Sequence, residues 1–169
     1  YLQVDDHIID IDLTPNRGDC LSIQGIAREL HALTGEKLAG PSLKPVRATS
    51  KHIVQLEIQA PRDAPRYVGR VIDGVVSQSK TPDWMRERLR RCGLRSIGAI
   101  VDITNYVMLE LGQPLHAFDP KEIKEKIVVR HSEKGENLDL LDRKSIQLTP
   151  ETLVIADADK AIGMAGIMG

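Results

Sequence analysis

The order of its strand-like and helix-like segments constrains the fold of this chain more than any other feature of its sequence. Residues 53–60 and 67–76 are rich in apolar residues, and Pro61 and Pro65 lie between them, which predicts two strands. Helix-like segments occupy the middle of the chain. Four short apolar runs follow and are also predicted to be strands: 127–131, 138–141, 146–148 and 153–156. Because strands and helices are grouped instead of alternating regularly, the sequence predicts an α+β (mixed α/β) fold with a mixed sheet.

Glycine and proline mark the expected ends of three helices. Asp19 can cap a helix whose apolar residues recur on one face until Gly35. A second helix is expected to begin at Pro82, because proline suits the first helical turn, and to end at Gly93. A third helix is expected over 97–111. One helix is therefore expected before the first two predicted strands, and two consecutive helices are expected after them.

The first part of the chain alternates between apolar and acidic residues, so residues 7–13 are predicted to form a half-buried strand. An acidic cluster with one histidine overlaps this segment: Asp5, Asp6, His7, Asp10 and Asp12. Such a cluster can hold a divalent cation. Alternation alone explains it as the solvated face of a strand, which is the interpretation that the sequence favours. Both ends of the sequence are interpreted as cut from a longer chain.

Charge and motifs exclude several classes of function. The net charge of -1 and a pI of about 6.6 argue against a broad basic surface that grips RNA phosphates, so any RNA contact should be local. Cys20 and Cys92 lie far apart, which gives neither a zinc pattern nor a disulfide framework and is typical of the cytoplasm. The sequence has no phosphate-binding loop, no HExxH, no nucleophile elbow and no apolar run long enough for a membrane span.

Five arginines are concentrated in and directly after the second predicted helix: Arg86, Arg88, Arg90, Arg91 and Arg95. Guanidinium groups bind phosphate well, so the group is a candidate nucleic-acid contact. Arginine-rich helices are, however, most often solvated surfaces with ion pairs one turn apart. Arg95 differs from the others because it follows Gly93, outside the helix, where a side chain can be directed at a ligand.

The most unusual segment is 102–119, which reads DITNYVMLELGQPLHAFD. Thr104 and Asn105 interrupt an apolar helix that ends at Gly112, and Pro114 fixes the turn that presents His116. These residues predict a small polar pocket at a helix end. The alternative is structural: the polar residues satisfy loop backbone and His116 is a hydrogen-bonded core residue.

Three stretches of the sequence carry a resemblance to a known family. IDLTPNRGDCLSIQGIARELHALTG, VDITNYVMLELGQPLHAFD and TLVIADADKAIGMAGIMG occur in this order. They resemble three stretches of the bacterial phenylalanyl-tRNA synthetase beta subunit, and together they span nearly the whole chain. The linker and the arginine-rich helix are less distinctive.

The resemblance implies a division into domains. Residues 1–40 correspond to the C-terminal part of a small B1 domain that is similar to a DNA-binding fold and is split around an RNA-binding barrel in the family. Residues 41–50 are a linker. Residues 51–169 correspond to the B3/B4 editing domain, a three-layer structure with a mixed sheet, truncated at its C-terminal end. The family's enzyme is a cytoplasmic α2β2 heterotetramer that joins phenylalanine to tRNA(Phe) with ATP and magnesium at the alpha subunit, so no cofactor is expected in this chain.

The family's editing site is carried over residue by residue. Arg95 would hold the tRNA end or support the pocket, and Asn105 would bond the polar groups of tyrosine. His116 would orient substrate or water, with Gln113 and Pro114 shaping its loop, and the backbone of Gly169 would approach the ligand. The implied function is hydrolytic proofreading of Tyr-tRNA(Phe) in the intact enzyme.

In the family, an acidic residue and further small residues of the pocket follow the position of Gly169 in sequence. The fragment alone is therefore expected to be inactive. The alternative function is a non-catalytic module that contacts tRNA or scaffolds the subunit.

Overall fold

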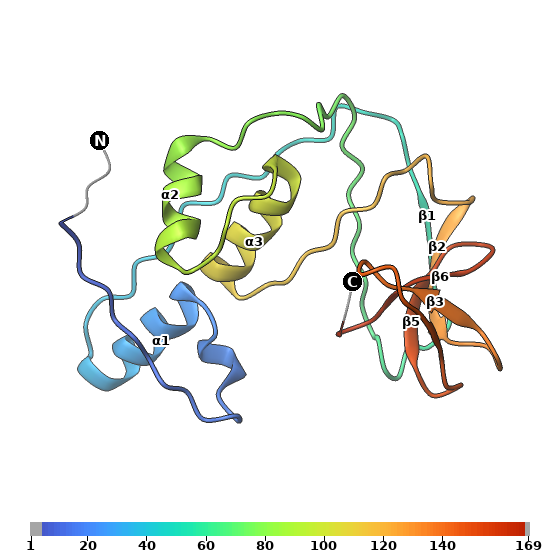
Figure 1. Ribbon diagram of the computed structural model, residues 1–169. Coiled ribbons are helices and arrows are strands. Elements are labelled where there is room, and N and C mark those ends of the chain that lie inside the picture. Colours follow the sequence, from blue (N-terminus) through green and yellow to red (C-terminus); the bar gives the residue numbers. More distant parts are fainter. Residues whose placement is uncertain (1–4, 168–169) are drawn as a thin grey trace. The chain divides into compact units, whose positions relative to one another are not determined.

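The computed structural model describes residues 5–167, and the chain divides into two compact units, each built from two chain segments (Figure 1). The helical unit comprises the residues up to Val46 together with Val76–Ala117. The sheet unit comprises Arg47–Val75 together with the residues from Phe118 onward. Helices and strands are therefore segregated into different units, and the predicted α+β fold with a mixed sheet is confirmed.

The helical unit begins with a 3-10 turn, Gly18–Cys20, and α1, Ile23–Thr34. Ser22 is the N-cap of α1 and accepts a hydrogen bond from Gly25 N at 2.9 Å. Asp19, the predicted cap, lies in the 3-10 turn and pairs with Arg17 instead. That prediction was wrong because the chain makes one tight turn before the helix begins. The helix ends as predicted at Gly35, which adopts the left-handed conformation with φ +73°.

The other two helices are α2, Asp83–Arg91, and α3, Ala99–Leu111, which confirms the predicted second and third helices. α3 packs against both α1 and α2. Gly112 closes α3 with φ +74°, and a Cβ atom at this position would lie 3.0 Å from Ser22 Oγ. The end of α3 therefore lies directly against the beginning of α1.

The sheet unit contains a four-stranded mixed sheet in the order β1-β2-β5-β6 and a two-stranded hairpin, β3-β4. The strands are β1 Gln55–Ile58, β2 Lys126–His131, β3 Asn137–Asp139, β4 Ser145–Gln147, β5 Leu153–Ala156 and β6 Ala161–Met164. β1 pairs with β2 in parallel, and the other pairs are antiparallel. Five of these strands were predicted and β6 was not.

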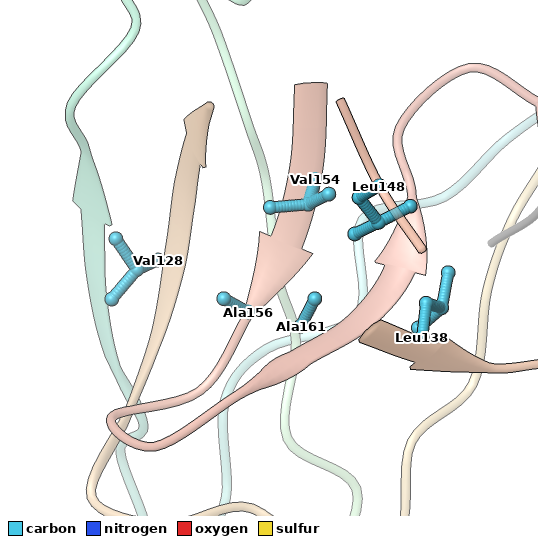
Figure 2. Close-up of a cluster of buried hydrophobic side chains, with 6 residues drawn as sticks. All are labelled: Val128, Leu138, Leu148, Val154, Ala156 and Ala161. Carbon is cyan, nitrogen blue, oxygen red and sulfur yellow. The ribbon is translucent and has the colours of Figure 1, made fainter. Parts of the chain in front are cut away.

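Both faces of the four-stranded sheet are covered by apolar side chains. On one face six buried residues from the sheet and the hairpin form a cluster, shown in Figure 2: Val128, Leu138, Leu148, Val154, Ala156 and Ala161. On the other face Ile127, Val129 and Ile155 pack against residues such as Tyr67 and Phe118. Burial on two faces explains why the central residues of β2, 127–129, and all residues of β5 are apolar.

Two predicted strands are absent from the described residues. Residues 7–13 form no strand, and Ile8 and Ile9 are 77% and 81% exposed. Residues 67–76 also form no strand. Gly69 and Gly74, the latter with φ +72°, interrupt that segment. Alternation and apolar content alone predicted these strands, but neither segment has a neighbour that supplies backbone hydrogen bonds in this part of the chain.

The predicted domain boundaries at residues 40 and 50, and the layer arrangement of the editing domain, stay predictions. In the part of the chain that the structure describes, no helix combines the length and the apolar character that a bilayer-crossing segment needs.

Candidate functional site

The helical unit contains five of the six predicted site residues, on three successive segments. Arg95 is exposed in the loop between α2 and α3, and Asn105 is half-buried in the middle of α3. Gln113, Pro114 and His116 follow the end of α3. Gly169 lies outside the described residues. The structure therefore gathers five candidates in one unit, and it forms no hydrogen bond between the Arg95 and Asn105 side chains in the described range.

A fully buried carboxylate, Asp102, lies on the same helix as Asn105 and bonds to the loop that carries Arg95. It is in the first turn of α3 and has no exposed surface. Its Oδ2 atom accepts hydrogen bonds from Thr81 Oγ1 and from Ser96 Oγ, the latter at 2.5 Å. Its Oδ1 atom accepts the backbone N–H of Ile97 at 2.9 Å. One side chain thus connects the start of α2, the loop after α2 and the start of α3.

The charge of Asp102 is stabilised by these donors. Burial alone would raise its pKa, but the hydrogen bonds from Ser96, Thr81 and the backbone of the 97–98 segment outweigh burial and hold the pKa below its ordinary value. The first turn of a helix also favours a negative charge. Asp102 is therefore ionised at neutral pH. Three hydrogen bonds and the dipole of α3 stabilise its negative charge.

His116 lies in the irregular segment after α3, where its surface is largely accessible. Partial burial nevertheless lowers the pKa of His116 below its ordinary value. The imidazole is therefore neutral at pH 7, with one nitrogen that can accept a proton and one that can donate. Next to it in the loop, Gln113 Nε2 donates to Pro114 O at 3.2 Å, a local bond that holds the turn.

Ion pairs involve most arginines of α2. Arg86 pairs with Asp83 at 3.2 Å. Arg90 and Arg91 both pair with Glu87, and Arg91 also pairs with Asp6 at 2.5 Å. These contacts support the interpretation of the helix as a solvated, salt-bridged surface. Within the described residues, Asp6 and its acidic neighbours form no group of three that could hold a metal ion.

Arg88 is arranged differently from the other arginines of α2. Its guanidinium carbon lies 5.4 Å from the ring centroid of Trp84 and 6.0 Å from that of Tyr106. Arg88 Nη1 donates to Tyr106 OH at 2.6 Å, and that hydroxyl donates to Glu110 at 3.1 Å. The two rings are perpendicular, with centroids 5.3 Å apart. This stack fastens α2 to the part of α3 that also carries Asn105.

A hollow of about 310 Å³ lies elsewhere in the helical unit, between the segment 11–20 and α1. Arg17 reaches Glu29 across it at 2.5 Å. None of the predicted site residues lines this hollow. It is therefore separate from the candidate site.

Reasoning from the sequence missed the polar residues that organise this region. Asp102 belonged to the unusual segment but received no role, and Thr81 and Ser96 were not singled out. The available signal was an aspartate within the first turn of a mostly apolar helix. Its partner Thr81 is 21 residues earlier, so only the fold reveals the pairing.

Comparison with known proteins identifies the family. Residues 63–169 match the model of the B3/4 domain. The whole chain is 54% identical to the phenylalanine--tRNA ligase beta subunit of Hahella chejuensis. It is 53% identical to the subunits of Nitrosococcus oceani and Coxiella burnetii. Each of these matches covers 100% of the chain and 21% of the relative, so the chain spans about a fifth of the length of the relatives. Since the domain model covers more than half of its residues, the chain belongs to the B3/4 domain family.

Proposed function

We propose that this chain is part of a phenylalanine--tRNA ligase beta subunit and supplies part of the proofreading site that hydrolyses Tyr-tRNA(Phe) in the intact enzyme. The observation that carries the proposal is the continuous match of all 169 residues to such subunits at 53–54% identity. The B3/4 match includes every residue assigned to the site from Arg95 to Gly169. The alpha partner, the α2β2 assembly and the use of ATP and magnesium belong to the proposal for the intact enzyme.

The need for a second site follows from binding energetics. A pocket shaped for phenylalanine rejects tyrosine weakly, because tyrosine differs by one added hydroxyl. A site with polar groups placed for a phenol reverses the preference, since phenylalanine would leave those groups buried and unpaired. Proofreading at such a site therefore selects tyrosine sharply.

The reaction needs little from the protein beyond positioning. Water attacks the ester carbonyl that joins tyrosine to the terminal ribose, the ester C–O bond breaks, and the ribose oxygen leaves with a proton. His116, with its lowered pKa, is neutral at pH 7 and suited to orient the water or accept its proton. Arg95 would contact the tRNA end, and Asn105 would bind the polar groups of tyrosine. Gln113 and Pro114 would shape the His116 loop, and Gly169 would border the ligand.

Substitution in the complete enzyme tests the proposal. His116→Ala and Arg95→Ala are each expected to lower kcat/KM for Tyr-tRNA(Phe) hydrolysis by about 100-fold, in the range of a lost proton-transfer or orienting group. Phenylalanylation of tRNA should be unchanged. His7→Ala and Arg28→Ala, which change an exposed histidine and an exposed arginine of the same unit, are the matched controls. Normal clearance in both site variants would reject the assignment and favour a non-catalytic tRNA-contacting or scaffolding module.

A further inference from the structure

We propose that Asp102 is a positioning residue that sets Arg95 in place relative to Asn105. The inference rests on the proposed proofreading function and adds a residue to which neither the resemblance nor the comparisons assign a role. Asp102 would touch neither tRNA nor tyrosine. It would act through the backbone of the loop that carries Arg95.

The first argument is convergence. Three donors from two stretches of chain meet on the two oxygens of one side chain: Thr81 Oγ1 from the first, and Ser96 Oγ and Ile97 N from the second. Thr81 is itself 6% exposed, and Asp102 is completely buried. An ionised carboxylate in such a place is costly unless donors surround it. Both oxygens have donors here, and no buried side-chain nitrogen or oxygen in the described residues lacks a partner.

The second argument is the position of the two site residues around this carboxylate. Arg95 directly precedes Ser96, one of the donors, so its backbone is fixed one residue from a bond to Asp102. Asn105 follows Asp102 by three positions on α3, which makes the two neighbours on the helix surface. The Arg95 side chain is exposed and has no hydrogen bond or ion pair within the described residues. Its direction therefore depends on its backbone.

The third argument is what an apolar residue could not do. Packing at the start of α3 could be supplied by leucine or methionine at less cost than a buried charge. A carboxylate can accept hydrogen bonds from both hydroxyls and from the backbone N–H, whereas an apolar side chain can accept none. Catalytic groups must be held within a fraction of an ångström by such supporting contacts. The hydrogen bonds of Asp102 are the kind of supporting contact that a site residue on a loop, such as Arg95, requires.

The test is a double-mutant cycle in the complete enzyme. Asp102→Asn should lower kcat/KM for Tyr-tRNA(Phe) hydrolysis by about tenfold, mainly through KM, because Arg95 would contact the tRNA end. Phenylalanylation should be unchanged. In an Arg95→Ala background the same substitution should change clearance by less than about twofold, because residues that act through one another are not additive. Ser96→Ala, which keeps the buried charge, should shift KM in the same direction by a smaller factor.

Asp157→Asn is the matched control. Asp157 is also buried, accepts backbone N–H bonds from Lys124, Asp159 and Lys160, and belongs to the sheet unit. It should leave clearance unchanged. Equal losses in the Asp102 and Asp157 variants, or full additivity with Arg95→Ala, would overturn the inference and leave only a general structural role.

Hydrogen exchange separates this inference from the proposed function. In Asp102→Ala, which removes the acceptor oxygen, the amide of Ile97 should exchange at least about tenfold faster. Unchanged Ile97 protection overturns the positioning role whatever the activity. If the unaltered enzyme clears no Tyr-tRNA(Phe), the proposed function fails, and Ile97 exchange still decides whether Asp102 holds the loop.

Discussion

Three acidic side chains, Asp102, Asp157 and Glu136, hold negative charge in places that water hardly reaches. Asp102 is fully buried, Asp157 is 3% exposed, and only 12% of the Glu136 side chain is exposed. In Asp157 burial raises the pKa, but backbone N–H donors outweigh burial and leave the pKa below its ordinary value. Glu136 instead has a full counter-ion, because Arg130 binds both of its oxygens at 2.7 and 2.8 Å. Each charge is thus retained by directed donors.

The contribution of the Glu136–Arg130 ion pair to stability should depend on pH. Hydrogen bonding to Arg130 lowers the pKa of Glu136 from 4.5 to about 2. A depressed folded-state pKa contributes stability that is present above pH 4.5 and is lost as the pH falls towards 2. We expect Glu136→Gln to cost on the order of 3 kcal/mol near pH 7 and much less near pH 2.

Urea unfolding of both proteins at each pH measures this difference. Glu133→Gln, at an exposed neighbouring glutamate, serves as the control. A cost for Glu136→Gln that stays constant between pH 7 and pH 2 would contradict the lowered pKa.

Among the elements, the contact between α3 and α1 depends on Gly112. Gly112 and Gly35 both close helices with φ near +74°, where alanine is strained by about 1 kcal/mol. Only at Gly112 would a Cβ atom also meet Ser22, whose hydroxyl caps α1. Gly112→Ala should therefore destabilise the protein by about 1 kcal/mol more than Gly35→Ala. Thermal unfolding of the two variants compares them directly, and equal losses would show that Ser22 moves aside without cost.

Helix ends were predictable because the rules that set them are local. Gly35 and Gly112 act through their own backbone conformation, and Pro82 through its fixed φ, so each can be read without the rest of the chain. Strands depend on neighbours. Residues 53–60 pair with β2, which begins 71 positions after Gln55, whereas the equally apolar segment 67–76 pairs with nothing in the described residues. No local pattern distinguishes these two segments.

For the molecule as a whole, the division into two units should be visible in hydrogen exchange. Val129 is fully buried in β2, and Val129→Ala should destabilise the sheet unit by about 2 kcal/mol. Amides of β1, β2, β5 and β6 should then exchange faster, while those of α2 and α3 keep their protection. Val68→Ala, at a valine that is 73% exposed in the same unit, should change neither. Equal acceleration in both units would show that they unfold as one.

The residues of the candidate site were predicted only from the resemblance to a known family. That resemblance supplied Arg95, Asn105 and His116, and the structure finds them in one unit. The buried bonds of Asp102 were not predictable, because they join residues 81, 96 and 102 through the packing of two helices.

The parallel pairing of β1 with β2 has a consequence for synthesis of the chain. Residues 76–117, which belong to the helical unit, lie between these two strands in sequence. As the polypeptide leaves the ribosome, β1 emerges first and has no partner until this entire stretch has followed. The helices can meanwhile assemble with α1, whose residues are already outside the exit tunnel. Translation speed across codons 76–117 would thus set how long an incomplete edge strand stays open to chaperones or to unwanted association.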